Sequence, residues 1–191
     1  MVADVPEDTV VLYEDERDFG CYSSTASDWS LQNCQEKVRT RGQNRKRYLF
    51  GARDAQTGQL YLRWAGRKNG ATFVLFLKSL RERLGARKLL LILDNFAVHK
   101  CRRVQDWLAE THANIQLLFL PTYSPWLNAI ENDWRIIKRR AHNNTWSDAT
   151  GLVIRRISLA LLHMGAVLLR PRLGQGSTSS RIRFYLVGER C

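Results

Sequence analysis

The stretch Leu89-Leu90-Leu91-Ile92-Leu93-Asp94-Asn95 decides the fold, because five apolar residues run directly into an acid. An unbroken apolar run of this length is typical of a strand buried on both faces. Such strands belong to sheets covered by helices, and ligands bind in the crevice beyond the carboxyl ends of their strands. Asp94 is therefore expected at a binding site. The alternative is that Asp94 or Asn95 caps the helix that we expect to follow.

A second strand of the same kind ends in acids at Thr9-Val-Val-Leu-Tyr-Glu-Asp-Glu16. Strand alternation places Tyr13 and Asp15 on one face and Glu14 and Glu16 on the other. Because a central strand is buried on both faces, alternation alone does not decide which acid is functional.

The remaining pattern predicts an α/β fold. We expect strands over residues 47–52, 60–64 and 115–120, and helices over 73–84, 98–108, 127–137 and 151–169. The order predicts a mixed sheet flanked by helices. Residues 1–170 form one domain in this interpretation, and residues 171–191 are a basic tail that resembles a linker.

A third acid lies within an apolar stripe. Residues at helical spacing form the stripe: Leu127, Ile130, Trp134 and Ile137. Glu131 falls on the same face, and a buried carboxylate is unfavourable unless it is paired or binds a metal. The alternative is a pair between Glu131 and Arg135 or Lys138 at a solvated edge.

Carboxylates from two strand ends and one helix can hold two Mg²⁺ or Mn²⁺ ions about 3.5–4 Å apart for phosphoryl transfer. The four cysteines show no C-x-x-C pair, which argues against a zinc knuckle or a disulfide framework. His99, five residues after Asp94, would contact the scissile phosphate, orient a carboxylate or serve a structural role.

The charge predicts a polyanionic partner. Thirty Lys and Arg against eighteen Asp and Glu give a net charge of +12, and nucleic acid is the expected ligand. For each basic cluster the alternative is a solvated charged face. The residues expected to contact nucleic acid are Arg45, Lys46, Arg47, His99, Lys100, Arg102, Arg103, Tyr123, Asn128, Lys138, Arg139 and Arg140.

No targeting or membrane segment is predicted. The first residues lack the basic and apolar regions of a signal peptide, and the longest nearly apolar run, residues 157–169, is too short to cross a bilayer. We expect a cytoplasmic, nucleoid-associated bacterial protein without a membrane partner.

Two motifs resemble the catalytic core of the DDE transposases, in the bacterial insertion-sequence branch related to the mariner group. They are Asp94-Asn-Phe-Ala-Val-His99 and Leu120-Pro-Thr-Tyr-Ser-Pro-Trp-Leu-Asn-Ala-Ile-Glu131-Asn-Asp-Trp-Arg-Ile-Ile-Lys138. The family pattern is D-N-x-x-x-H, then L-P-x-Y-S-P-x-L-N-P-I-E-x-x-W-x-x-x-K, and Ala129 replaces its second proline. The 36 residues between Asp94 and Glu131 fit that branch. Upstream matches extend the resemblance to residues 9–165: Asp15-Glu16, Trp29, 42–44, 50–52 and 57–58.

The resemblance implies a ribonuclease-H-like fold with a five-stranded mixed sheet. It also implies that Asp15, Asp94 and Glu131 are the catalytic and metal-binding triad, with two Mg²⁺ or Mn²⁺ ions. The implied activity is strand cleavage at transposon ends followed by strand transfer. The alternatives are a catalytically silent DNA-binding remnant and a ribonuclease-H-like nuclease.

The implied partners are double-stranded DNA, as transposon ends and target, and a second copy of the chain in a homodimer. We expect the helix-turn-helix region that such transposases use for end recognition to come from an upstream reading frame.

Overall fold

The computed structural model describes residues 6, 8–21, 45–111, 114–122, 124–143 and 149–169. The expected tail over residues 171–191, the matches at Trp29 and residues 42–44, and Tyr123 lie outside the described residues.

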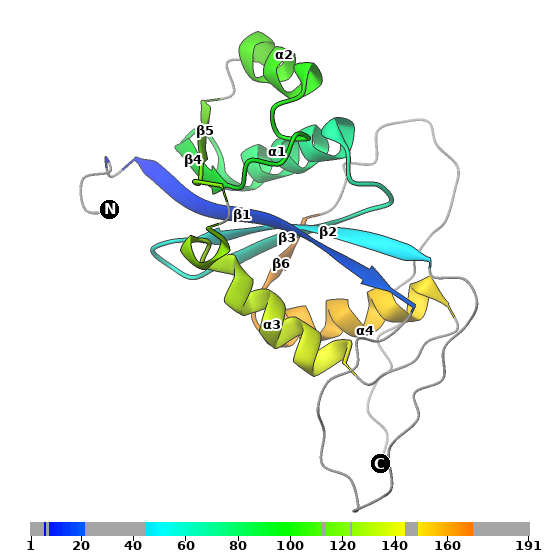
Figure 1. Cartoon of the computed structure of the whole chain (residues 1–191). Helices are drawn as coiled ribbons and strands as arrows, with labels where there is room; N and C mark the ends of the chain where they lie inside the picture. The colour runs from blue at the N-terminus through cyan, green and yellow to red at the C-terminus, as the bar shows by residue number, and fades with distance from the viewer. Residues whose placement is uncertain are drawn as a thin grey trace, which may run out of the picture.

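A mixed six-stranded sheet forms the centre of the described chain, with strand order β5-β4-β1-β2-β3-β6 (Figure 1). Its strands are β1 (Thr9–Gly20), β2 (Lys46–Asp54), β3 (Leu60–Ala65), β4 (Lys88–Leu93), β5 (Ile115–Phe119) and β6 (Val167–Leu168). β1 pairs antiparallel with β2 and parallel with β4, while β5 runs parallel to β4. The predicted mixed α/β sheet is confirmed.

The expected number of five strands is wrong by one. Val167 and Leu168 pair with Tyr61 and Leu62 at the outer edge of β3 and make the sixth strand. A two-residue strand carries too little pattern to be found in the sequence, because its pairing depends on an edge that only the folded sheet presents.

Helices cover both faces of the sheet (Figure 1). α1 (Gly70–Leu84) and α2 (Arg102–Thr111) lie on one side, and α3 (Ile130–Ala141) and α4 (Thr150–His163) lie on the other. A short 3₁₀ helix, Pro125–Leu127, precedes α3. The helix predicted over residues 98–108 begins later than expected, at Arg102, so the expectation that His99 is helical was wrong.

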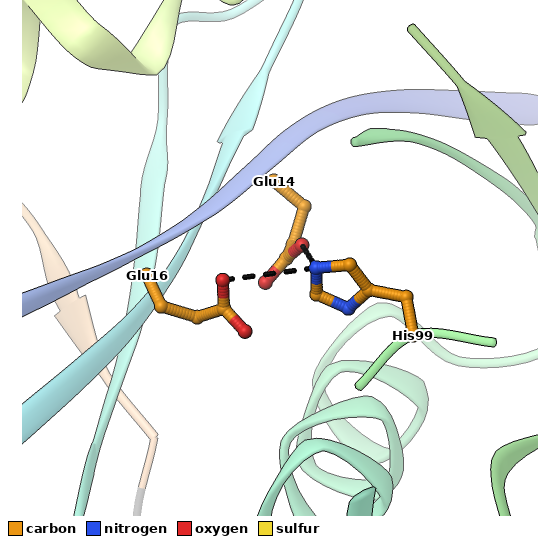
Figure 2. Close-up of side chains that lie close together, drawn as sticks. All are labelled: Glu14, Glu16 and His99. Atoms are coloured by element: carbon orange, nitrogen blue, oxygen red, sulfur yellow. Dashed lines mark ion pairs between the residues drawn. The ribbon is translucent and has the colours of Figure 1, made fainter. Parts of the chain in front are cut away.

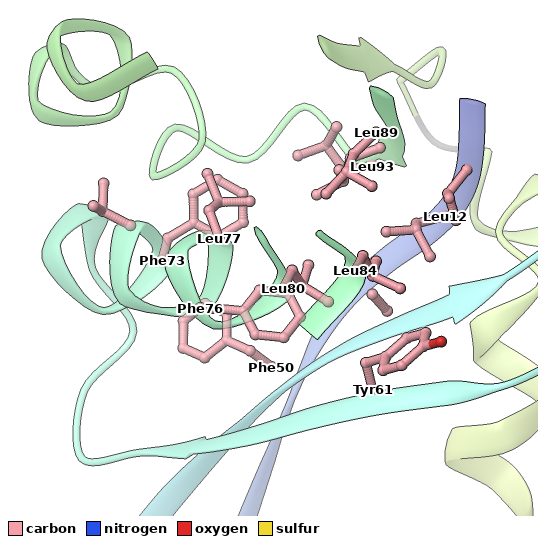
Figure 3. Close-up of a cluster of buried hydrophobic side chains, with 14 of the residues drawn as sticks. Leu12, Phe50, Tyr61, Phe73, Phe76, Leu77, Leu80, Leu84, Leu89 and Leu93 are labelled. Atoms are coloured by element: carbon pink, nitrogen blue, oxygen red, sulfur yellow. The ribbon is translucent and has the colours of Figure 1, made fainter. Parts of the chain in front are cut away.

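Two apolar cores result from this layering. The first, between the sheet and α1, is drawn in part in Figure 3 and includes Leu12, Phe73 and Leu91. The second lies between the sheet and the helices α3 and α4, and includes Phe19 and Trp134. β1 contributes to both cores, as a central strand with apolar residues on both faces does.

α1 begins and ends at residues whose chemistry suits those positions. The Asn69 side chain accepts a hydrogen bond from the backbone N–H of Thr72, and the Thr72 side chain accepts one from the backbone of Asn69. This reciprocal capping box satisfies N–H groups that the first turn leaves unpaired. Gly85 ends the helix with a φ of 70°, which glycine adopts without steric strain.

None of the helices in the described part of the chain has the length and apolar character needed to cross a membrane.

A close approach at Gly51 lets α3 pack against the sheet. Gly51 pairs with Asp15 across β1 and β2. A Cβ atom at Gly51 would lie 2.7 Å from the Trp134 ring and 2.9 Å from Ile130 Cδ1. The absence of a side chain therefore leaves room for the Trp134 indole beside Asp15.

We predict that Gly51→Ala lowers the free energy of unfolding by about 1–3 kcal/mol, because overpacking displaces the rigid Trp134 ring. Gly66→Ala is the matched control, since a Cβ there meets no atom within 4 Å. Urea unfolding of both variants tests this prediction. Equal stability of the two variants would contradict the packing described for Gly51.

Candidate active site

The acids of β1 point alternately to the two faces of the sheet. Glu14 and Glu16 are buried on the α1 side, where they lie near His99. Asp15 is half-buried on the α3 side, and its Oδ2 accepts a hydrogen bond of 2.8 Å from Trp134 Nε1. The separation of Asp15 from Glu14 and Glu16 that strand alternation predicted is therefore confirmed.

Glu131 lies in the first turn of α3 and is partly exposed. Burial is the main cause that raises the pKa of Asp15 to about 7, and the charges of Glu131 and Glu16 add to it. The hydrogen bond from Trp134 acts in the opposite direction. The effect of Glu131 indicates that α3 and β1 bring these two carboxylates within electrostatic reach of each other.

Asp94 directly follows β4. The parallel register pairs Tyr13 with Ile92, and Asp15 and Asp94 each come two residues later. Adjacent strands lie about 4.8 Å apart, so this register brings the backbones of Asp15 and Asp94 to the same level at the carboxyl end of β4.

The Asp94 side chain is 57% exposed, and its Oδ1 accepts the backbone N–H of Phe96 at 3.0 Å. The same oxygen lies 3.3 Å from His99 Nε2, and this contact is the first cause that holds the pKa of Asp94 below its usual value. Asp94 therefore caps the turn after β4. It does not cap α2, which begins only at Arg102.

Two polar contacts set the position of α3. Asn128, just before the helix, is buried and donates a 2.8 Å hydrogen bond from Nδ2 to the backbone oxygen of Glu14. Asp133 accepts 2.9 Å hydrogen bonds from Arg53 on β2 at both carboxylate oxygens. Ala129, at the N-cap, makes no side-chain cap. The Asn128 contact therefore does the positioning at this end of the helix.

The residues expected to contact nucleic acid are distributed over two faces. The start of α2 lies on one side of the sheet, and the last turn of α3 lies on the other (Figure 1). His99 and Asn128 are buried. Arg47 and Lys138 are partly exposed. The exposed members are Arg45, Lys46, Lys100, Arg102, Arg103, Arg139 and Arg140.

Some of these cations already have acidic partners. Lys46 contacts Asp18 at 2.8 Å, and Arg102 contacts Asp106 at 3.5 Å. For Glu131, the described residues show no ion pair with either Arg135 or Lys138, the alternative that the sequence left open.

Sequence reasoning did not find the buried cluster of Glu14, Glu16 and His99 (Figure 2). His99 Nε2 lies 3.9 Å from Glu14 Oε2 and 3.7 Å from Glu16 Oε2. Lys68 Nζ lies 3.2 Å from Glu16. The signal that could have found the pair is alternation itself, since two glutamates at i and i+2 of a central strand share one face.

Burial is the first cause that raises the pKa of both glutamates, that of Glu14 well above its usual value. Neighbouring carboxylates add to the rise, while His99 and Lys68 oppose it at Glu16. The cluster is therefore unfavourable for two ionised carboxylates unless further positive charge is present.

Comparison with solved structures identifies the class of fold. The chain superposes on the Mos1 transposase paired-end complex with left transposon end, with a TM-score of 0.61 and 16% identity, covering 80% of this chain and 47% of that one. It superposes on the Mos1 mariner paired-end complex with Mn with a TM-score of 0.60 and 17% identity, over 80% of this chain and 48% of that one. The fold is ribonuclease-H-like, as expected.

Sequence comparison then gives the family. Residues 10–153 match the DDE superfamily endonuclease model, and the chain belongs to this family. A protein of Shigella sonnei described as insertion element IS630 uncharacterized 39 kDa protein is 38% identical over 128 residues. The match covers 66% of this chain and 37% of that relative.

The raised pKa of Asp15 predicts a pH-dependent stability. Because the pKa is about 7 in the folded protein and 3.8 ordinarily, the stability that protonated Asp15 contributes is lost as pH rises between these values. Asp15→Asn cannot ionise and can still accept the Trp134 hydrogen bond. In EDTA, its free energy of unfolding relative to wild type should rise by up to about 1.4 kcal/mol per pH unit from pH 5 to 7.

Urea unfolding at several pH values measures this difference. Asp18→Asn is the control, because the hydrogen bond from Lys46 lowers the pKa of Asp18 and keeps it ionised throughout this range. The difference in the free energy of unfolding between Asp18→Asn and wild type should not change with pH. A pH-independent difference for Asp15→Asn as well would show that Asp15 ionises freely in the folded protein.

Proposed function

We propose that this chain is the catalytic domain of a metal-dependent DNA transposase, in which Asp15, Asp94 and Glu131 act together. The observation that supports the proposal is that β1 and the first turn of α3 bring Asp15 and Glu131 within electrostatic reach, with the end of β4 beside β1. Family membership and the Mos1 fold support the same class of reaction.

The residues present fit a divalent metal. Asp15 and Glu131 repel each other, and the backbone of Asp94 lies at the same level of the sheet while its carboxylate contacts His99. Oxygen ligands of this kind suit Mg²⁺ and Mn²⁺. When bound, two such ions supply positive charge that stabilises an in-line displacement at phosphorus.

The proposed reaction has two stages. In cleavage, a water oxygen bonds to phosphorus as the bond to the 3′ oxygen breaks, and that oxygen takes up a proton to become a 3′-hydroxyl. In strand transfer, this 3′-hydroxyl attacks a phosphodiester of the target DNA and displaces its 3′ oxygen. Each stage exchanges one P–O bond for another, so positioning and charge stabilisation are what the protein must supply.

The surrounding side chains hold the three acids in place. Trp134 Nε1 restrains the Asp15 carboxylate, the backbone of Phe96 restrains Asp94, and Asn128 ties the start of α3 to β1. This support allows the carboxylates to keep one geometry despite their repulsion.

The partners are part of the proposal. The exposed cations at the start of α2 and the end of α3 would contact the phosphates of transposon ends and target DNA. The paired-end assembly of Mos1 supports a homodimer. The helix-turn-helix region that the resemblance implies for end recognition also belongs to the proposal.

We predict that Asp94→Asn reduces Mg²⁺- or Mn²⁺-dependent strand cleavage to below a few per cent, while DNA affinity changes little. The substitution removes an anionic ligand but keeps an oxygen for the Phe96 N–H. Asp106→Asn, at an exposed acid on α2, is the control and should retain cleavage. Single-turnover cleavage of an end-containing duplex, with affinity measured on the same duplex, provides both values.

If Asp94→Asn cleaves as well as wild type, the proposed triad is wrong. If the wild-type chain binds DNA but does not cleave it in either metal, the chain is a silent DNA-binding remnant.

DNA affinity should also fall steeply with salt, and the last turn of α3 should contribute to that dependence. Replacing both Arg139 and Arg140 by Ala should lower the slope of log affinity against log salt by roughly one for each phosphate that the variant no longer neutralises. Arg83→Ala is the control, because Arg83 is exposed on α1, on the other side of the sheet. Equal slopes for all three proteins between about 50 and 200 mM salt would exclude this part of α3 from the DNA interface.

A further inference from the structure

A cluster of unpartnered polar atoms lies on the face of β1 opposite Asp15. The side chains of Glu14, Glu16 and His99 are fully buried. Among the described residues, none of the four glutamate oxygens and neither imidazole nitrogen has a hydrogen bond of good geometry. Glu16 Oε2 lies 3.2 Å from Lys68 Nζ and His99 Nε2 lies 3.3 Å from Asp94 Oδ1, but both Glu14 oxygens, Glu16 Oε1 and His99 Nδ1 have no such close polar contact. Buried polar atoms are nearly always hydrogen-bonded, so this group of unsatisfied atoms indicates that a ligand completes the cluster.

The spacing of the atoms fits a cation. The distances of 3.9 and 3.7 Å from His99 Nε2 to Glu14 and Glu16 are too long for hydrogen bonds. Two groups bonded to one shared water would lie roughly 4.6 Å apart. Two ligands about 2.0–2.2 Å from one ion lie roughly 3.3–3.6 Å apart in tetrahedral geometry. The observed distances are closer to the spacing expected around one shared ion than to that around a shared water.

The charges around the cluster are unbalanced without an ion. Glu14, Glu16 and the adjacent Asp94 carry three negative charges when ionised, and Lys68, 3.2 Å from Glu16, contributes one positive charge. A divalent cation beside neutral His99 brings the sum to zero. Lys68 alone leaves two of the three negative charges uncompensated, and the Glu14 and Glu16 carboxylates are fully buried and poorly solvated.

The surroundings hold the imidazole in place. The Phe73 ring contacts His99 edge to face at a centroid distance of 4.5 Å, and Phe96 lies at 6.0 Å. Figure 2 shows the imidazole, on the turn after β4, directed at the two glutamates of β1. Three potential ligands therefore converge from two segments that are far apart in the sequence.

We propose that Glu14, Glu16 and His99 form a binding site for one divalent transition-metal ion, such as Mn²⁺ or Zn²⁺, next to Asp94 and on the face of β1 opposite Asp15. One imidazole and two carboxylates favour these ions over Mg²⁺, which prefers oxygen ligands. The ion would connect β1 to the turn of residues 94–100 and so steady the segment that carries Asp94. The site uses neither Asp15 nor Glu131.

The first step of the test neutralises the acids on the opposite face of β1. In the variant Asp15→Asn/Glu131→Gln, two of the three acids of the proposed catalytic site are neutral while the buried cluster is unchanged. After treatment with EDTA, equilibrium dialysis against Mn²⁺ or Zn²⁺ with elemental analysis should give about one ion per chain. The melting temperature should rise with the concentration of either ion.

Adding Glu14→Gln and Glu16→Gln to this background should abolish that ion. The fold should survive without metal, because the added amides keep the side-chain volume and remove buried charge. Far-UV circular dichroism and a melting temperature in EDTA no lower than that of the background check this. Adding His99→Gln instead should weaken Zn²⁺ binding at least tenfold.

Absence of a stoichiometric ion in the Asp15→Asn/Glu131→Gln background would overturn the proposal and leave Lys68 as the sole counter-charge. Retention of the ion after both glutamate substitutions would also overturn it, because the ion would then be bound elsewhere. These measurements do not depend on cleavage, so they hold whether or not the proposed transposase activity is found.

Discussion

The structure depends on one constraint: β1 is a central strand covered on both faces, yet it carries three consecutive acids. Burying a carboxylate is unfavourable unless positive charge or hydrogen bonds compensate. The chain meets this constraint differently on each face. Asp15 has the Trp134 N–H and proximity to solvent, while Glu14 and Glu16 have Lys68 and His99 nearby but no hydrogen bond to either glutamate carboxylate from His99.

The elements around β1 are arranged to suit these acids. Gly51 opposite Asp15 makes room for the Trp134 indole, and Asn128 ties the start of α3 to the β1 backbone. On the other face, the turn after β4 brings Asp94 and His99 together. His99 therefore lies between Asp94 and the two buried glutamates, so a change at Glu14 or Glu16 can reach Asp94 through His99.

Much of the fold could be predicted, because its strands and helices have strong local patterns. The apolar runs before Glu14 and Asp94 are strands, and the stripe through Ile130, Trp134 and Ile137 is the buried face of α3. The prediction failed where pattern is weak. His99 lies in a turn instead of a helix. The Asp94 side chain accepts the backbone N–H of Phe96 and stabilises a turn there, and α2 begins only at Arg102.

The sequence by itself determined the class of fold, through contiguous apolar runs, and the family, through two motifs whose resemblance also implies the three acids proposed for catalysis. Only the tertiary structure decided which side chains meet these acids on each face of β1 and which polar atoms have no hydrogen bond of good geometry. Alternation separates Asp15 from Glu14 and Glu16, but the position of His99 depends on a turn that packs against Phe73 from another element. Such long-range contacts leave no local pattern, so the buried cluster emerged only from the folded chain.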